Sequence, residues 1–366
     1  MSIKDIKSAD EPFNTERAWT ILKALADTPC PSQTVSYSRA LVISSMLAHF
    51  GQPEATYLAD YLNTGNAALL LGDQARPPML VFAHLDQVSY MVGPKLSDGR
   101  YQLAPYCTHL AKSEVEALVL RYSAETGSME RMGRGVISSE LDGDTLQPLF
   151  TPADGLELQM GDRLVFDYPM QRKADGTALG HIDNAAGVTA CLMAAIALLE
   201  MRPQTQVGFI FTDEEEGPSQ TPRSFARGAR RLMGRIQPPG LCIVVDGHSD
   251  NLKVMGSGAL YAERSGEGRS AVTPPHLFAR FQRLMNELNQ SGIPLHPNPG
   301  RISRSDDVAL ISYTANILNL GYPTTNSHFD QGPPSANLND IVALARTLYW
   351  LVIRLEDFAC QNATVG

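Results

Sequence analysis

Residues 207–217 read VGFIFTDEEEG, an uninterrupted apolar run of strand length that ends in four consecutive acidic residues. Two other stretches repeat this arrangement: residues 79–86 read MLVFAHLD, and residues 241–248 read LCIVVDGH. Short apolar runs of this kind are typical of strands that are buried on both faces of a sheet. The pattern therefore predicts several buried strands whose ends carry acids and histidines.

Helical segments alternate with these runs along the chain. Helix-like spacing of apolar residues covers residues 15–26, 36–50, 184–201 and 338–358, and a further strand is predicted at 316–320. Strands that alternate with helices favour an α/β fold, with a mostly parallel sheet sandwiched between helices.

The stretch 88–170 differs from the rest of the chain. Gly, Asp, Ser and Pro interrupt it, and its apolar runs are short, at 117–120, 135–137 and 164–166. Short strands separated by turn-forming residues predict a small β-barrel-like domain. We therefore expect residues 88–170 to be inserted into a discontinuous catalytic domain of residues 1–87 and 171–366.

Composition and charge exclude several classes of protein. The chain has 366 residues, of which 43% are hydrophobic and 19% charged, as in globular rather than disordered proteins. Its longest apolar run, 190–199, is far shorter than the roughly 20 residues of a membrane span. Residues 1–11 lack the apolar core of a secretory signal. The net charge of −9 argues against nucleic-acid binding, so we expect neither a membrane nor a nucleic-acid partner.

The five cysteines indicate the redox setting. No two of them have the CxxC spacing of a thiolate metal site, and their odd number does not suit a disulfide framework. Each is expected to be a small apolar core residue. A reduced, cytoplasmic setting is the expectation that follows.

Metal-capable side chains follow the predicted strands or open a helix. They are His84, Asp183, the acidic run 213–216, Asp246 and His328. Each alone has an ordinary explanation, since Asp183 can cap a helix and an acidic run suits a helix start. Ligands of open α/β sheets bind beyond the carboxyl ends of the strands, where these residues would meet. Together they predict a two-metal hydrolytic centre for Zn²⁺, Co²⁺ or Mn²⁺, with one bridging carboxylate and a separate carboxylate base.

A family resemblance supports this interpretation. In chain order, five segments resemble the co-catalytic metallo-aminopeptidase clan, and within it the glutamyl-aminopeptidase family of tetrahedral (TET) aminopeptidases: VFAHLDQVSYMV, LGHIDNAAGVTACLMAAIALLE, FIFTDEEEG, IVVDGHSD and NSHFD. In that family a β-barrel domain, which serves assembly, fills the gap between the positions of His84 and Asp183. The resemblance implies an aminopeptidase that acts on peptides with a free N-terminus and forms a homo-oligomer, from a dimer up to a dodecamer.

The resemblance also implies roles for individual residues. His84, Asp183 and Asp246 would hold one divalent ion, and Asp183, Glu215 and His328 would hold a second. Zinc is the expected metal, with cobalt or manganese as alternatives.

The catalytic acids are assigned in the same way. Glu214 would be the general base and acid, and Asp86 would orient the first metal-binding histidine. The glutamate pair is aligned by its distance to Gly217. A shift of one residue, which makes Glu215 and Glu216 the pair, stays open.

Some positions depart from the family pattern or stay unassigned. Gln87 stands where the family commonly has an acid, and Asn184 stands where it has a second aspartate. His181 and His248 lie beside the motifs and are candidates for the pocket, and residues 305–307 resemble a segment that lines the family's site. The departures spare every predicted ligand, but they leave the substrate preference open.

Three other functions agree less well with the sequence. Deacylases and carboxypeptidase-like amidohydrolases use the same machinery, but their added domain follows the second ligand set rather than preceding Asp183. A glycosidase needs two carboxyls about 5–9.5 Å apart across a sugar bond, an arrangement that adjacent glutamates do not predict. A non-catalytic scaffold would lack a ligand or the base, and neither is missing. Metal identity, oligomer size and physiological substrate are not decided by the sequence.

Overall fold

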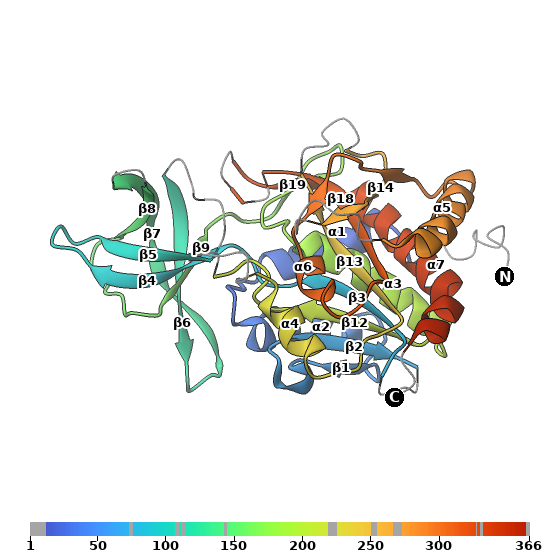
Figure 1. Ribbon diagram of the computed structural model, residues 1–366. Coiled ribbons are helices and arrows are strands. Elements are labelled where there is room, and N and C mark those ends of the chain that lie inside the picture. Colours follow the sequence, from blue (N-terminus) through green and yellow to red (C-terminus); the bar gives the residue numbers. More distant parts are fainter. Residues whose placement is uncertain are drawn as a thin grey trace.

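The protein consists of an α/β domain from which a smaller β-barrel projects (Figure 1). The computed structural model describes residues 12–72, 76–106, 110, 114–142, 145–218, 225–249, 255–265, 273–326, 328–329 and 332–363. The chain enters the barrel after the third strand of the α/β domain and returns to the large sheet after the barrel is complete. The predicted α/β fold with an inserted barrel is confirmed.

One large mixed sheet forms the centre of the α/β domain. In the described residues its order is β1 (Thr56–Leu58), β2 (Ala67–Leu71), β12 (Val207–Thr212), β3 (Met79–His84), β13 (Leu241–His248), β18 (Ile317–Thr325), β19 (Ser335–Asn337), β11 (Thr177–Leu179) and β10 (Gln171–Arg172). On this sheet β14 (Ala259–Ala262) pairs with β18, and β16 (Leu295–Pro297) pairs with β14. The central strands β12, β3, β13 and β18 are parallel, whereas the flanking pairs on this path are antiparallel. The four parallel strands therefore bring their carboxyl ends to one edge.

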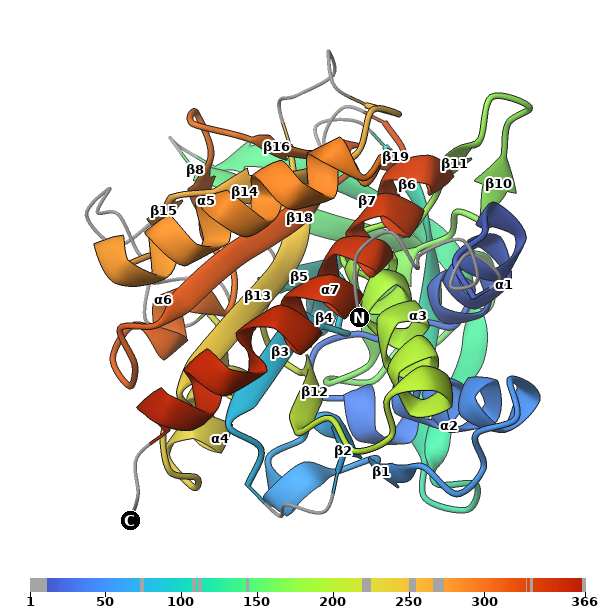
Figure 2. The ribbon, with the colours of Figure 1, turned by 90° about the vertical axis from the view of Figure 1, so that its right-hand side faces the viewer.

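Two layers of helices cover the sheet (Figure 2). One face carries α1 (Thr15–Ala26), α2 (Arg39–His49), α3 (Ala185–Met201), α5 (Pro275–Gln290) and α7 (Leu338–Asn362). The other face carries the shorter α4 (Arg227–Met233) and α6 (Asp307–Leu310). Helix α3 is buried continuously from Ala185 to Leu198, because it lies between the sheet and the helices α1 and α7.

The inserted domain is a closed barrel with its own core. Its strands, in spatial order, are β4 (Ser89–Lys95), β5 (Tyr101–Tyr106), β8 (Thr145–Pro152), β7 (Ser128–Asp142), β6 (Val115–Ser123) and β9 (Arg163–Phe166). Phe329, from the loop after β18, joins this core and packs 4.8 Å from the ring of Phe166. The barrel is thus packed against a loop of the α/β domain.

Smaller elements complete the described chain. Strands β15 (Arg264–Ser265) and β17 (Ile302–Ser303) form a separate parallel pair, and short 3₁₀ helices span Val35–Tyr37 and Tyr61–Asn63. Among the described helices, none combines the length and the apolar content that a membrane crossing requires. Cys30, Cys191 and Cys242 are buried free thiols and Cys360 is exposed, while Cys107 lies outside the described residues.

A close backbone contact fixes α7 beside the start of β13. A Cβ atom at Gly240 would lie 1.9 Å from the carbonyl oxygen of Ala359, so no side chain fits there. We expect Gly240→Ala to lower the free energy of unfolding by about 3 kcal/mol, because the overlap can be relieved only by moving the backbone. Chemical denaturation measures this loss against Gly300→Ala, where the added Cβ meets no atom within 4 Å. Equal midpoints for the two variants would show that α7 is not fixed by this contact.

Candidate metal centre

The predicted ligands converge at the carboxyl edge of the parallel strands. His84 is the last residue of β3, Asp246 lies near the end of β13, and Asp183 directly precedes Asn184, the N-cap of α3. His84 is 1% exposed and Asp183 is 9% exposed. Because adjacent parallel strands end side by side, residues distant in sequence share one buried site.

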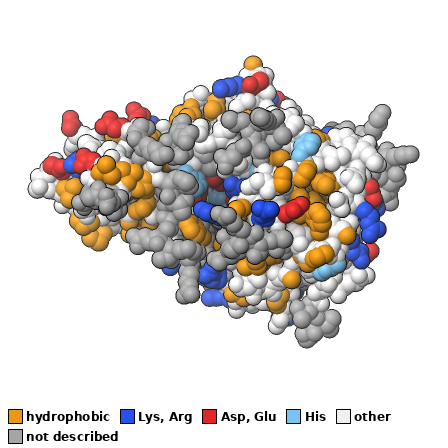
Figure 3. Space-filling view, turned by 45° about the horizontal axis from the view of Figure 1, so that its top comes forward, with side chains coloured by type: hydrophobic (Ala, Val, Ile, Leu, Met, Phe, Trp, Pro, Cys, Tyr) orange, Lys and Arg blue, Asp and Glu red, His pale blue; other side chains and the backbone are white. Residues whose placement is uncertain are grey.

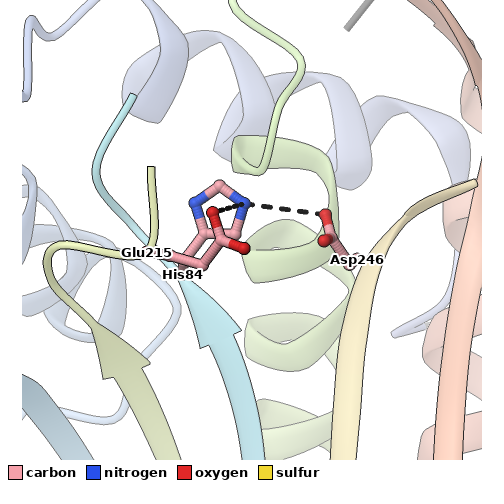
Figure 4. Close-up of side chains that lie close together, drawn as sticks. All are labelled: His84, Glu215 and Asp246. Atoms are coloured by element: carbon pink, nitrogen blue, oxygen red, sulfur yellow. Dashed lines mark ion pairs between the residues drawn. The ribbon is translucent and has the colours of Figure 1, made fainter. Parts of the chain in front are cut away.

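His84 lies at the centre of the first group of metal-capable side chains (Figure 4). Its Nε2 atom is 3.1 Å from Asp183 Oδ1, 3.6 Å from Asp246 Oδ1 and 3.8 Å from Glu215 Oε2. Its Nδ1 atom lies 3.1 Å from the backbone oxygen of Asp86. A bond from Nδ1–H to that oxygen leaves the lone pair of Nε2 directed at the carboxylates, as a metal ligand requires.

A second group lies on the other side of Asp183. His328 Nε2 is 3.7 Å from Asp183 Oδ2 and 3.6 Å from Glu216 Oε2. The two oxygens of Asp183 thus face different histidines. Glu216 is buried, and its Oε1 atom has no hydrogen-bond partner among the described residues. Ser327 and Asp330 of the same motif lie outside the described residues.

Glu214 faces away from these two groups. Its carboxylate is paired with Arg231, lies 3.4 Å from Nη1 of Arg227 and accepts a 3.1 Å hydrogen bond from Gln33 Nε2. The backbone of Glu214 is left-handed, with φ of 56°. A non-glycine residue adopts this conformation at some cost, which is a recurring feature of functional turns. Among the three glutamates, it is therefore Glu215 and Glu216 that lie with the histidines.

The carboxylate of Asp86 supports the loop that carries these glutamates. It accepts hydrogen bonds from Ser32 Oγ at 2.6 Å and from the backbone N–H groups of Glu215 and Glu216 at 3.1 and 3.3 Å. The nearest contact of this carboxylate with His84 Nδ1 is longer, at 3.7 Å. Asp86 therefore contacts His84 through its backbone oxygen and fixes the glutamates through its side chain.

Burial and neighbouring charges shift the pKa values of several side chains in the site. Burial and neighbouring acids hold the pKa of Glu215 and Glu216 well above the usual range. Burial alone would lower the pKa of His84, but Glu215, Asp183 and Asp246 raise it well above the ordinary value. Carboxylate oxygens of Asp86, Asp183, Glu215 and Asp246 lie within 3.8 Å of a ring nitrogen of His84. Such a group of buried and half-buried carboxylates is costly unless positive charge compensates it. The donor set and the orphaned oxygen of Glu216 fit divalent metal ions that prefer nitrogen and oxygen ligands.

Two residues that support the site, Asn184 and Asp306, had no role assigned from the sequence. Asn184 accepts a hydrogen bond from Gly187 N at the start of α3 and donates one to the backbone oxygen of Val245, beside Asp246. Asp306 is fully buried and accepts a 2.6 Å hydrogen bond from Thr212 Oγ1 at the end of β12. The resemblance of residues 305–307 to a site-lining segment was the signal for Asp306.

The histidines left unassigned by the sequence are both buried. His248 ends β13, and His181 packs 5.0 Å from the ring of Phe329. His181, Gln87 and Phe166 line a cavity of about 470 Å³ where the barrel meets the α/β domain. Histidine, acidic and basic side chains reach the surface between the barrel and the α/β domain (Figure 3).

Comparisons with solved structures agree with the fold. The TET aminopeptidase from the marine sediment archaeon Thaumarchaeota archaeon SCGC AB-539-E09 superposes with a TM-score of 0.74 at 16% identity, covering 94% of this chain and 99% of that one. An aminopeptidase from the archaeon Desulfurococcus kamchatkensis gives 0.70 at 16% identity, with 96% and 99% covered. The TET1 peptidase of Pyrococcus horikoshii gives 0.68 at 18% identity, with 92% and 99% covered. These similarities extend over the barrel as well as the α/β domain.

Sequence comparisons give the family. No curated protein sequence matches the chain. The model of peptidase family M20/M25/M40 matches residues 157–354, which is more than half of the chain. The matched stretch contains Asp183, the acidic run 213–216, Asp246 and His328. The chain therefore belongs to peptidase family M20/M25/M40 and is a peptide hydrolase with an inserted β-barrel domain.

Proposed function

We propose that this peptidase is a metal-dependent aminopeptidase that uses two divalent ions to remove N-terminal residues from peptides. The observation that carries the proposal is the buried group in which Asp183 lies between His84 and His328, with Glu216 and Asp246 beside it. Few arrangements other than a pair of metal ions stabilise so many acids in one buried place.

The metal ligands follow from the two groups of side chains. His84, Asp183 and Asp246 would hold one ion, and Asp183, Glu216 and His328 would hold the other. Zinc is the expected metal, and cobalt and manganese suit the same ligands. When bound, the ions polarise the scissile carbonyl and lower the pKa of the attacking water.

Glu215 is the residue that we assign as general base and acid. Its carboxylate lies 3.8 Å from His84 Nε2, and among the described residues no arginine forms an ion pair with it. It takes a proton from the water and passes it to the leaving amine. The alternative assignment, with Glu214 as base and Glu215 as ligand, would require the Glu214 carboxylate to leave Arg231 and Arg227. Asp86 then supports Glu215 by accepting its backbone N–H.

The position of the barrel favours an aminopeptidase over a deacylase or carboxypeptidase-like enzyme. Strands β4 to β9 lie between His84 and Asp183 in the chain. Two of the similar structures that cover this stretch as well as the α/β domain carry the name aminopeptidase. The deacylase or carboxypeptidase-like function remains the second candidate. We assign residues 88–170 to the inserted domain and residues 1–87 and 171–366 to the catalytic domain.

Assembly and location form a separate part of the proposal. The support for assembly is the likeness to structures whose coverage includes the barrel. The Pyrococcus horikoshii TET1 peptidase can assemble into a tetrahedron or a large octahedral shell. We infer a homo-oligomer, between a dimer and a dodecamer, in the cytoplasm.

A peptide library in two forms tests the proposed activity. One form has free N-termini and the other is N-acetylated, and each is incubated with Zn²⁺, Co²⁺ or Mn²⁺ and with a chelated control. We expect residue-by-residue release from the free form only, and only with metal. Removal of the acyl group, or cleavage of the acetylated form from its C-terminus, would move the function to a deacylase or carboxypeptidase. Failure to cleave either form with metal bound would contradict the peptide substrate.

A further inference from the structure

A buried arginine beside the metal centre makes its observed hydrogen bonds to neutral groups. Arg39 is fully buried, and its guanidinium donates to the backbone oxygens of Thr28 and Leu85 at 2.9 and 3.0 Å. Its third bond, at 2.6 Å, goes to the side-chain oxygen of Gln87. A buried guanidinium needs each of these acceptors, so Gln87 is held firmly in one orientation.

The orientation of Gln87 determines what its nitrogen does. The Oε1 atom accepts from Arg39 and also from the backbone N–H of Cys30 at 3.0 Å. The Nε2 atom therefore faces His181, whose Nδ1 atom lies 3.1 Å away. His181 Nε2 lies 2.8 Å from the backbone oxygen of Phe166, to which it donates, so its Nδ1 is the acceptor for the amide. A carboxylate at position 87 has no proton to donate to this nitrogen.

This chain of bonds joins the two loops that meet at the metal centre. Gln87 follows His84 by three residues, and His181 precedes Asp183 by two. The far end of the chain, Phe166, is the last residue of β9 in the barrel. The bond between Gln87 and His181 therefore connects the loop after β3 to the loop before α3, and both to the barrel.

We propose that Gln87 is a positioning residue of the metal centre, whose side-chain amide fixes the loop of His84 relative to the loop of Asp183 by donating to His181. The inference rests on the proposed metal centre. The spacing to be held is the 3.1 Å between His84 Nε2 and Asp183 Oδ1. Groups that hydrogen-bond a metal ligand directly typically contribute roughly 10–100-fold to metal affinity or activity, and this range is the upper bound for Gln87, which acts through His181.

The direct test replaces the amide with an apolar side chain of similar length. We expect Gln87→Met to weaken metal binding by up to roughly 10–100-fold and to lower kcat, with KM for a peptide nearly unchanged. The matched control is Asn289→Ala, which removes two hydrogen bonds between the end of α5 and the backbone of Leu295 in β16. The control should lower the unfolding midpoint and leave metal affinity and kcat as in the wild type. Wild-type metal affinity and kcat in Gln87→Met would overturn the proposal.

A double-mutant cycle isolates the bond itself, and it also serves if Gln87→Met folds poorly. His181→Phe keeps a ring but removes both hydrogen-bonding atoms, whereas His181→Asn retains an acceptor in the place of Nδ1. We expect His181→Asn to bind metal nearly as tightly as the wild type and His181→Phe to bind it as weakly as Gln87→Met. The double variant Gln87→Met, His181→Phe should be no weaker than the weaker single variant. Losses that add, or equal losses in the two His181 variants, would overturn the role of this bond.

Metal binding and activity of the wild-type protein distinguish failure of the proposed function from failure of the positioning role of Gln87. If it binds no divalent ion and is inactive, the proposed function and the positioning role fail together. If it binds two ions and hydrolyses peptides while the Gln87 and His181 variants match it, only the positioning role fails.

Discussion

Glu215→Gln is expected to lower peptide hydrolysis by about 10²–10⁴-fold while the chain still binds two metal ions. The amide has the size of the carboxylate but cannot take a proton from water or deliver one to the leaving amine. The carboxylate lies 3.8 Å from His84 Nε2, and the residue Glu215 is only 7% exposed. The substitution therefore changes chemistry at the site rather than at the surface. Steady-state rates and the metal content of the same preparation measure the two effects.

The neighbouring glutamates supply the comparison. Glu216→Gln should retain one ion and lose the other, because Glu216 faces His328. Glu214→Gln should keep both ions and most of the activity but unfold at a lower denaturant concentration, because it weakens the pairing with Arg231 and Arg227. The opposite pattern would contradict the assignment: an inactive Glu214→Gln with two ions, and a Glu215→Gln that loses one.

Asp183→Ala is expected to remove both ions and all measurable activity. Its two oxygens lie 3.1 Å from His84 Nε2 and 3.7 Å from His328 Nε2, so the substitution removes a carboxylate from both groups. Asp246→Ala and His328→Ala should each weaken one ion only. Mass-spectrometric metal counts after dialysis distinguish these outcomes. Asp162→Asn, which alters a buried acid that pairs with Arg121 in the barrel, should keep both ions. A single retained ion in Asp183→Ala would show that this carboxylate does not bridge.

Much of the fold could be predicted from hydrophobic patterning alone. The run at 79–83 became β3, and the helix expected at 15–26 has those bounds in the structure. Strands β13 and β18 extend beyond the predicted runs, because parallel pairing continues through Asp246 to His248 opposite Gly321 to Pro323. That pairing joins distant segments, so no local pattern reveals it.

Helix α5 was not among the helices predicted from the sequence. Its buried residues nevertheless have helical spacing: Leu277, Phe281, Leu284 and Leu288. The strand order of the barrel could not be predicted from the sequence either, because short strands separated by turns do not indicate which strands pair. Only the closed order from β4 to β9 shows that the inserted stretch shares one core.

The closeness of the candidate residues in space follows from their places in the chain, whereas their roles stay predictions. Predicted strand ends and the start of a predicted helix indicated His84, Asp183, Asp246 and His328, and these side chains lie close together in the structure. The glutamate pair could not be fixed, because consecutive identical acids carry no periodicity. The left-handed turn at Glu214 and its arginine partners decide which carboxylates face the histidines. Both features depend on tertiary contacts with α4.

Counting the metal ions in the wild-type protein while following its peptidase activity tests the central claim most directly. The purified chain is stripped with a chelator, titrated with Zn²⁺ and assayed on free and N-acetylated peptides at each point. The account predicts that activity on free peptides is lost on stripping and returns as two ions bind per chain. Peptide hydrolysis that persists without metal, or a chain that binds no divalent ion at saturation, would contradict it.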